Sequence, residues 1–407
     1  MKRRVFGIAA VLGVIASIAA WTAAAGSQSA KLQAPVTLPF KLVTRHMVLP
    51  VAVNNSRLLA FVLDTGNRMG VIDVDRAREL GVTLGREVKV GGVGPEALTG
   101  FFVQNASLNI ERLPGFSQPV SLAIPLRRLA ARFGHDFDGI LGSEFIKEFV
   151  VEVNYDARAI TLHDRETFNY SGQGAIIPIR LNSSGHPLID AHVTPVGKSP
   201  ISGTFVIDLG SGGALALHSP FVAEHRLPGP DVKTIASLGR GGTGGATTGR
   251  TGRVTALTIG QFMIRDVPTH FSEDASGAFA SAAVNGNIGQ QVMGRFRIFL
   301  DYGRNRIILE PTSALAGPFD RASSGITYEA VDLDYRTFRI TTILEDSPAT
   351  DARLAVGDVI VAVDGRKAPD LTITVMHELF EQPTPRTLTI QRGDSRLTVT
   401  LTPRVMF

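Results

Sequence analysis

Two aspartates, Asp64 and Asp208, stand in the same local context in this chain of 407 residues. Each follows directly on a continuous apolar run, which is typical of a buried strand. A carboxylate at the end of a buried strand is costly unless it is hydrogen-bonded or functional. The glycine two positions later, Gly66 or Gly210, permits a tight turn and a close approach of the backbone. Either tripeptide alone is typical of an ordinary loop, so the pair matters only within a larger pattern.

That larger pattern is an internal repeat. The first copy reads LLAFVLDTGN, then VGGVG, then FDGILGSEFIKEFVVEVNYDARAITLHD, and the second reads GTFVIDLGSG, then LGRGGTGG, then VNGNIGQQVMGRFRIFLDYGRNRIILEP. Asp64 precedes Gly142 by 78 positions and Asp208 precedes Gly289 by 81, so one insertion of three residues accounts for the difference. Tandem copies predict a pseudo-twofold arrangement whose corresponding loops meet at a central cleft.

Both copies have the texture of β-structure. Short runs of valine, isoleucine, leucine and phenylalanine alternate with glycine, proline and asparagine, which predicts a mainly β fold. We expect only brief helices, at Asp75 to Leu80 and Ser219 to His225 after the two aspartate motifs, and at Ser143 to Phe149 after Gly142.

With these motifs the chain resembles the retropepsin-like and pepsin-like aspartic proteases, whose lobes each supply Asp-Thr-Gly and, later, a hydrophobic-hydrophobic-Gly segment. The matching segments are Asp64-Thr65-Gly66 with Ile140-Leu141-Gly142, and Asp208-Leu209-Gly210 with Asn287-Ile288-Gly289. The resemblance covers about residues 35 to 313. It implies two tandem acid-protease β-barrel lobes, 35–170 and 171–313, around a pseudo-twofold cleft.

The resemblance also implies a function, an aspartic endopeptidase that acts on polypeptides without a metal or organic cofactor. Asp64 and Asp208 are then the catalytic residues, which share one proton and activate a water for attack on the peptide carbonyl. The residues expected to support the two active-site loops are Thr65, Gly66, Gly210 and Ser211.

Two positions depart from the family pattern. Leu209 stands where the family has a threonine whose hydroxyl cross-links the active-site loops, and Asn67 replaces a small residue. These departures leave a second hypothesis open, in which the chain is a non-catalytic peptide-binding protein with a degenerate protease cleft.

Glycine-rich segments follow each aspartate motif. We expect them to form flap-like hairpins over the substrate, and the alternative is an ordinary surface loop. The residues assigned to the flaps are Gly92, Gly94, Gly241 and Gly242.

The last part of the chain has a different character. Residues 314–324 have the small, proline-containing composition of a linker, and 325–407 form one small domain. Its segment SPATDARLAVGDVIVAVDG resembles the signature of bacterial PDZ domains, which implies an α+β unit that binds a C-terminal peptide in a groove. We expect a strand at Phe338 to Ile343 beside a helix at Thr372 to Glu381. The groove residues would be Phe338, Ile340, Met376 and Leu379. The alternative is a module that only packs on the protease.

The N-terminus predicts export. Lys2, Arg3 and Arg4 precede an apolar run that ends in Ala23-Ala24-Ala25, so residues 1–25 read as a signal peptide. This places the protein in the periplasm or outside the cell, and an uncleaved membrane anchor is the alternative. The net charge is +4, three units of which belong to that leader, so a nucleic-acid partner is not expected. The chain has no cysteine, which excludes disulfides and thiol chemistry.

Overall fold

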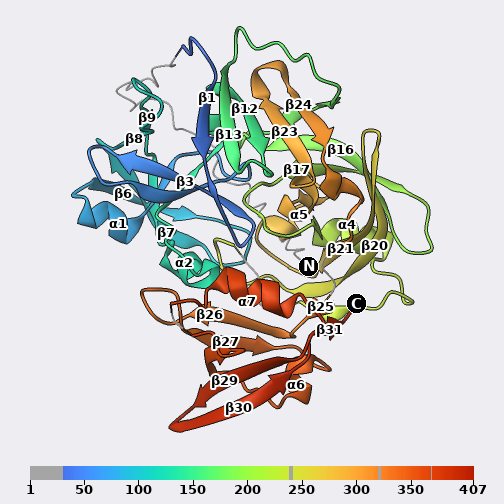
Figure 1. Ribbon diagram of the computed structural model, residues 1–407. Coiled ribbons are helices and arrows are strands. Elements are labelled where there is room, and N and C mark those ends of the chain that lie inside the picture. The colour runs from blue at the N-terminus through green and yellow to red at the C-terminus, as the bar shows by residue number, and fades with distance from the viewer. Residues whose placement is uncertain (1–30, 238–241, 320–321, 368) are drawn as a thin grey trace, which may run out of the picture.

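The chain folds into two β lobes and a smaller C-terminal unit (Figure 1). The computed structural model describes residues 31–237, 242–319, 322–367 and 369–407, so the predicted signal segment 1–25 lies outside the described residues. The mainly β, two-lobed architecture predicted from the repeat is confirmed. Among the helices of the described ranges, none has both the length and the apolar character needed to cross a membrane.

The first lobe is built on one ten-stranded sheet. Its strands are β2 (Lys41–Val43), β3 (His46–Val53), β4 (Leu59–Leu63), β5 (Val71–Asp73), β6 (Thr83–Val90), β7 (Leu98–Gln104), β8 (Ser107–Asn109), β9 (Gln118–Pro119), β10 (Leu122–Ile124) and β11 (Gly139–Leu141). They lie in the order β6-β7-β10-β5-β11-β4-β3-β8-β9, and β2 pairs with β3. β11 runs parallel to β4, the strand that leads into Asp64.

The second lobe repeats this plan with eight strands. They are β15 (Arg180–Leu181), β16 (Pro187–Thr194), β17 (Ile201–Ile207), β18 (Leu215–Leu217), β19 (Ile235–Ala236), β20 (Gly249–Ile259), β21 (Phe262–Ser272) and β22 (Gly286–Ile288). The run β16-β17-β22-β18-β21-β20 corresponds to β3-β4-β11-β5-β10-β7, and β22 lies parallel to β17 as β11 does to β4. The extra pairing of β16 with β20 curls this sheet toward a barrel.

A six-stranded sheet joins the lobes. Its order is β1 (Val36–Pro39), β13 (Ala159–Asp164), β12 (Phe149–Asn154), β23 (Phe296–Asp301), β24 (Arg306–Pro311) and β14 (Ala175–Pro178). The pseudo-twofold axis passes between β12 and β23, which pair antiparallel, because β13 and β1 on one side match β24 and β14 on the other. Each lobe therefore contributes three strands to a shared base.

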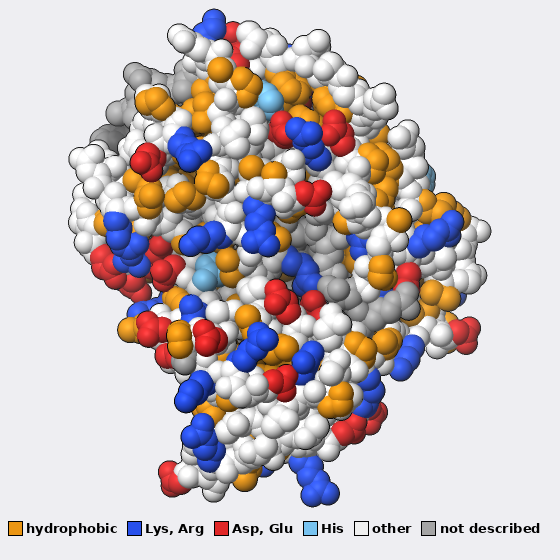
Figure 2. Space-filling model, in the orientation of Figure 1, with side chains coloured by type: hydrophobic (Ala, Val, Ile, Leu, Met, Phe, Trp, Pro, Cys, Tyr) orange, Lys and Arg blue, Asp and Glu red, His pale blue; other side chains and the backbone are white. Residues whose placement is uncertain are grey.

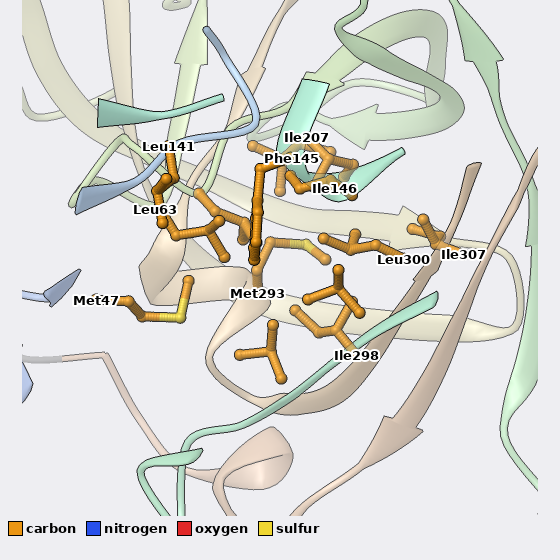
Figure 3. Close-up of a cluster of buried hydrophobic side chains, with 14 of the residues drawn as sticks. Met47, Leu63, Leu141, Phe145, Ile146, Ile207, Met293, Ile298, Leu300 and Ile307 are labelled. Carbon is orange, nitrogen blue, oxygen red and sulfur yellow. The ribbon is translucent and has the colours of Figure 1, made fainter. Parts of the chain in front are cut away.

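One apolar core runs through both lobes and this shared sheet. Figure 3 shows side chains from both lobes and the joining sheet in a single cluster, among them Leu63, Leu141, Ile207 and Leu300. Leu63 and Ile207, the residues before the two aspartates, are fully buried. Burying such a side chain stabilises the fold by about 1.5–3 kcal/mol, so the aspartate loops start from firmly held strand ends.

The predicted helices are present, with small differences at their ends. α1 (Val74–Glu79) and α4 (Ser219–His225) follow the two aspartate motifs, and α3 (Ser143–Ile146) follows Gly142. α3 is shorter than expected because the chain enters β12 at Phe149. Its counterpart in the second lobe is α5 (Gln290–Met293), which follows Gly289.

One helix of the first lobe, α2 (Arg127–Phe133), was not among the predicted elements. Its signal was present in the sequence, since apolar residues recur at helical spacing from Leu126 to Phe133. Gly134 then ends the helix in the left-handed conformation, at φ 64°.

The C-terminal unit contains a five-stranded sheet and two helices. The sheet order is β26 (Ile326–Ala330), β27 (Phe338–Ile343), β28 (Val359–Val363), β29 (Arg386–Arg392) and β30 (Ser395–Leu401), and the helices are α6 (Pro348–Asp351) and α7 (Ile373–Phe380). A separate pair joins β25 (Ala322–Ser323) to β31 (Arg404–Val405). The expected strand at Phe338 to Ile343 and the helix within Thr372 to Glu381 are confirmed.

The assignment of Phe338 and Ile340 to a peptide groove is wrong. β27 is hydrogen-bonded to β26 on one side and to β28 on the other, and both side chains are fully buried in the core of the unit. An incoming strand needs a free edge, and the sheet edge beside α7 is β26. There the ring of Tyr328 lies 5.7 Å from that of His377 on α7.

The two groove residues assigned to α7 differ in burial. Met376 is fully buried, while Leu379 is partly buried against the core of the C-terminal unit.

The segment predicted as a linker is held in place at its start. It begins within the 3₁₀ helix η3 (Ser313–Ala316). In the described ranges the chain also forms the 3₁₀ helices η1 (Ala278–Ala280) and η2 (Tyr302–Arg304). The guanidinium of Arg295 donates to the carbonyls of Ala314, Leu315, Gly317 and Pro318. It also lies 3.8 Å from the centre of the Phe319 ring. The chain leaves the second lobe along a defined path.

Candidate active site

The two aspartates lie at equivalent strand ends. The backbone N–H of Asp64 donates to the carbonyl of Leu141 at 2.9 Å, and that of Asp208 donates to the carbonyl of Ile288 at the same distance. In each lobe the strand before the aspartate and the later hydrophobic-hydrophobic-Gly strand run side by side in parallel. This pairing holds both loops at the junction of the lobes.

Each aspartate loop closes on itself through its glycine. The N–H of Gly66 donates to Oδ1 of Asp64 at 2.7 Å, and that of Gly210 donates to Oδ1 of Asp208 at 3.0 Å. A charge-assisted bond of this kind favours the ionised carboxylate and fixes its orientation.

The glycines also show how closely the loops meet. A Cβ on Gly210 would lie 2.2 Å from Cγ of Asp64, and a Cβ on Gly66 would lie 2.9 Å from Oδ1 of Asp208. Each glycine therefore packs against the aspartate of the opposite lobe, where a side chain has no room. The predicted pair, Asp64 and Asp208, is brought together by the structure.

Thr65 cross-links the loops, as expected for a supporting hydroxyl. Its fully buried Oγ1 donates to the carbonyl of Ile207 at 2.6 Å and accepts from the N–H of Leu209 at 2.8 Å. The equivalent side chain in the second lobe is Leu209 itself, so that half of a symmetric cross-link is replaced by apolar packing. The carbonyl of Leu209 accepts from Nε2 of Gln290 at 2.5 Å, which ties the loop to α5.

Ser211 acts through its backbone. Its N–H donates to the carbonyl of Asp208 at 3.2 Å, and its carbonyl accepts from the N–H of Gln290 at 2.8 Å. The N–H also favours the ionised form of the Asp208 carboxylate. Asn67, the other departure from the family pattern, secures its own turn by donating to the carbonyl of Met69 at 2.6 Å.

Burial shapes the charge of the pair. It raises the pKa of Asp64 to about 8, with further contributions from the charge of Asp208 and a hydrogen bond between the two carboxyls. Burial also raises the pKa of Asp208, but the hydrogen bond from Asn287 opposes the rise. Two such carboxyls titrate as a unit and share a proton over a wide pH range.

Three further residues surround the pair, and sequence reasoning gave none of them a role. Nδ2 of Asn287 donates to Oδ2 of Asp208 at 2.8 Å, and Nε2 of His218 lies 3.0 Å from Oδ1 of Asn287. His186, at the start of the second lobe, acts electrostatically on Asp208. The sequence does contain a sign that Asn287 has a special role, because it is polar at the position where the first copy has the apolar Ile140.

The predicted flap segments meet each other. Gly94 N–H donates to the carbonyl of Thr243 at 3.3 Å, Glu96 N–H to that of Gly244 at 2.8 Å, and Ala278 N–H to that of Gly92 at 3.2 Å. A Cβ on Gly92 would lie 2.0 Å from the Thr243 carbonyl oxygen, so this contact needs glycine.

Of the second-lobe flap residues, Gly242 is described and packs near Val93 of the first lobe, while Gly241 lies outside the described residues.

The arrangement combines two similar β lobes, a shared six-stranded sheet and a pair of aspartate loops at the lobe junction. No protein-family model matches the chain. No curated protein sequence matches it either.

Among solved structures, the aspartic proteinase from Irpex lacteus is 15% identical at a TM-score of 0.43, with 70% of this chain and 99% of that chain covered. Basic 7S globulin from soybean is 10% identical at a TM-score of 0.41, with 70% and 97% covered. At these values neither likeness assigns an activity to this chain.

Proposed function

We propose that the protein is an exported aspartic endopeptidase. The observation that carries this proposal is the contact of two partly buried carboxyls, those of Asp64 and Asp208, across the junction of two similar lobes. Burial and mutual repulsion keep one proton on the pair, which is the state that acid-base hydrolysis needs. Export is inferred from the basic and then apolar leader at residues 1–25.

In the proposed reaction the ionised carboxylate accepts a proton from a water while the water oxygen attacks the peptide carbonyl carbon. The protonated carboxyl donates its proton to the carbonyl oxygen, which gives a neutral gem-diol. Collapse of the gem-diol breaks the C–N bond. The leaving nitrogen takes the proton from the carboxyl that had accepted it from water, and a gem-diol hydroxyl gives its proton to the other carboxylate. The products are a carboxylic acid and an amine, and the pair is again singly protonated. Thr65 and the two glycines hold the loops in the required contact.

The joined flap segments suit a polypeptide substrate. Their contact across the lobes uses backbone groups of Gly92, Gly94 and Gly244, so these segments can part and re-form without side-chain rearrangement. We infer that they open to admit an extended chain and then exclude water from the cleft.

The test is cleavage of an unstructured polypeptide, such as denatured casein, by the full chain. Asp64→Asn and Asp208→Asn should each lower kcat/KM by a factor of about 10²–10⁴ or more, because each removes an acid-base group. A statine-type transition-state mimic should inhibit the wild type. Equal cleavage by the wild type and both variants would refute the proposal.

A second candidate function is a peptide-binding protein without catalysis. The observation that favours it is Leu209, which leaves the second loop without its own hydroxyl cross-link. On this hypothesis the wild type would bind the statine-type mimic or an extended peptide by calorimetry and still cleave nothing between pH 3 and pH 8.

For the C-terminal unit we propose a PDZ function. The support is the signature around Ser347 and Gly357, together with an edge strand, β26, that lies beside α7. A peptide added to that edge would gain main-chain hydrogen bonds, and side chains of α7 would select among sequences. The unit would serve to capture substrate or to regulate the protease.

A further inference from the structure

The two catalytic loops differ in what faces each carboxyl. Asn287 in β22 donates from Nδ2 to Oδ2 of Asp208 at 2.8 Å. The equivalent residue of β11 is Ile140, an apolar side chain that packs among Val48, Val62 and Val71. A side-chain amide donor therefore comes to one aspartate from a position that is apolar beside the other.

Asn287 is itself held by a second side chain. His218, just before α4, is only 2% exposed, and its Nε2 lies 3.0 Å from Oδ1 of Asn287. With the ring proton on Nε2, His218 donates to this amide oxygen, and the amide N–H group then faces Asp208. Nδ1 of His218 lies 3.2 Å from the carbonyl of Ser281, and its ring packs against Phe279 with centroids 5.1 Å apart. The histidine thus has a fixed orientation.

We propose that Asn287, oriented by His218, is a positioning residue that makes Asp208 the ionised member of the dyad and leaves the proton on Asp64. A hydrogen bond donated to a carboxylate stabilises its charged form, and among the residues that the structure describes Asp208 alone of the two aspartates receives one from a side-chain amide. Asp208 is then the base that takes the proton from water, and Asp64 is the acid that protonates the peptide carbonyl oxygen. This assignment rests on the proposed function.

Other groups also act on the pair. The charge of His186 and the backbone N–H groups of Gly210 and Ser211 all favour the ionised form of Asp208. The pKa of the buried Tyr302 hydroxyl is raised by burial and, further, by the charge of Asp64. Of these, the backbone donors have a counterpart in the first lobe, since Gly66 donates to Asp64. Asn287 is the asymmetric donor.

The test is the pH dependence of the dyad in Asn287→Ile, which copies the first-lobe residue. The acid limb of kcat/KM should move up by about one to two pH units, as expected when a carboxylate loses a hydrogen bond. In His218→Phe, which keeps the ring packing, the shift should have the same sign and be smaller. Asn285→Ala is the control, because its Oδ1 accepts from the Thr204 N–H and does not touch the dyad.

Carboxyl ¹³C NMR titration of the same variants gives a readout that does not need turnover. The lower apparent pKa of the dyad should rise in Asn287→Ile, and it should keep its wild-type value in Asn285→Ala. A lower melting temperature with an unmoved titration would show that Asn287 is only structural and would overturn the proposal. If the wild type cleaves nothing but the titration still shifts in Asn287→Ile, the protease function is refuted and the positioning role of Asn287 stands.

A second inference concerns the junction between the C-terminal unit and the first lobe. Helix α2, which bears no catalytic residue, lies against the edge strand β26, as Figure 1 shows from the adjacent positions of α2, β26 and α7. Gly134 at the end of α2 abuts α7, since a Cβ on this glycine would lie only 2.6 Å from Cβ of Ile373. The hydroxyl of Tyr335 donates to Asp136 at 3.3 Å.

Charged residues reinforce this junction. Arg45 donates to Glu381, the residue that ends α7, at 2.7 Å, and Glu329 of β26 acts electrostatically on Arg132 of α2. Side chains of both signs gather where the C-terminal unit meets the lobes (Figure 2). The edge that a peptide would use is therefore covered by the chain's own first lobe.

The same junction reaches the catalytic loops. The ring of Phe133 in α2 lies 4.2 Å from that of His46, which is buried beside the Asp208 loop. His46 faces the backbone of Gly210, and a Cβ on Gly212 would lie 3.4 Å from its Cε1. Arg45, the neighbour of His46, is the residue that pairs with Glu381. The turn at Thr44 to His46 thus touches both the C-terminal unit and the loop of Asp208.

We infer that α2 and the Thr44–His46 turn form a latch between the two sites. When a peptide binds to β26 the dyad is not held together, and when the dyad is held together β26 is closed to a peptide. An extended peptide on β26 must displace α2, and the displacement removes the packing of Phe133 on His46. By linkage, any change that opens the junction must also loosen the Asp208 loop. This rests on the proposed peptide-binding role of the C-terminal unit.

Charge reversal tests the latch without a known ligand. In the full chain, Glu381→Arg should speed hydrogen exchange of the β26 amides by about three- to tenfold and lower kcat/KM by a similar factor, because it places two arginines together. Arg45→Glu combined with Glu381→Arg should restore both values. Asp351→Arg is the control, since it breaks an ion pair with Arg404 that lies away from α2.

Two outcomes would overturn the latch. Unchanged exchange at β26 in Glu381→Arg would mean that the ion pair does not hold the junction closed. Faster exchange with unchanged kcat/KM and an unchanged dyad titration would mean that the junction opens without affecting the active site. The titration decides the matter if the wild type proves inactive.

Discussion

The two aspartate loops differ far more in their side chains than in their backbone. In both loops a glycine N–H donates to the aspartate carboxylate, and both loops follow a strand that is paired in parallel with a later strand of the same lobe. The side chains differ, because Thr65 of the first loop corresponds to Leu209 of the second. The buried hydroxyl of Thr65 bonds to the second lobe on both sides of Asp208, and its counterpart is a leucine. The comparison teaches that the backbone and a single cross-link are enough to bring the carboxyls together.

The largest expected loss of activity tests the close backbone contact between the two aspartate loops. In Gly210→Ala the new Cβ would lie 2.2 Å from Cγ of Asp64, so a carboxyl or a loop must move. A displacement of about 1 Å in a catalytic group costs about 10²-fold, so kcat/KM should fall by at least that factor. Gly303→Ala is the control, because nothing lies within 4 Å of its Cβ position. Activity within threefold of wild type in Gly210→Ala would contradict the close contact.

The next effect tests the cross-link. Thr65→Val keeps the shape but removes the partner of two buried backbone groups, the Ile207 carbonyl and the Leu209 N–H. The free energy of unfolding should fall by about 2–4 kcal/mol in urea titrations. Thr37→Val provides the comparison, since its bond to Thr161 is exposed and should contribute less than about 1 kcal/mol. Equal losses in the two variants would argue against a special role for Thr65.

A third prediction uses the shared proton. Burial raises the pKa of Asp64 to about 8 from 3.8, so the folded state holds a proton that the unfolded chain releases. The stability it contributes is therefore fully present below about pH 4 and is lost as the pH rises toward 8. The free energy of unfolding should decline by up to about 1 kcal/mol per pH unit over this range.

Asp64→Asn is the control for that decline, because it cannot titrate. Denaturant unfolding of both proteins from pH 4 to pH 8 should show a steeper loss in the wild type than in the variant. Parallel curves would show that Asp64 does not hold the extra proton.

The smallest expected effect sharpens the comparison by making the loops alike. Leu209→Thr would offer a second hydroxyl at the junction and remove a buried leucine side chain. The new hydrogen bond contributes about 0.5–1.5 kcal/mol, and the lost apolar burial offsets much of it. We expect the unfolding free energy to change by less than about 1 kcal/mol and kcat/KM to change by less than threefold. A large gain in activity would mean that Leu209 limits the natural protein.

Much of the fold followed from local patterns. The repeat predicted two similar β lobes because each copy carries the same order of apolar runs, glycines and short helices. Helix α2 was missed although its apolar residues recur at helical spacing and Gly134 marks its end. Such features depend on neighbouring residues, and a sequence displays them directly.

The groove assignment went wrong for a different physical reason. Phe338 and Ile340 have the alternating apolar pattern of a strand, and that pattern is the same for an edge strand and an interior one. Which strand lies at the edge depends on how β26, β27 and β28 pair with one another, and the pattern within one strand does not report that pairing. The sequence likewise does not reveal which carboxylate a polar residue such as Asn287 will bond to.

The sequence by itself determined that two Asp-x-Gly turns recur in one repeat and that β-strands carry them. Only the tertiary structure decided that Gly210 lies against Asp64, that Asn287 serves Asp208, and that α2 covers β26. Local patterns report which side chains are buried, because burial follows the period of each strand or helix. Contacts between buried polar groups depend on how separate sheets pack, and that packing is settled by the whole core at once.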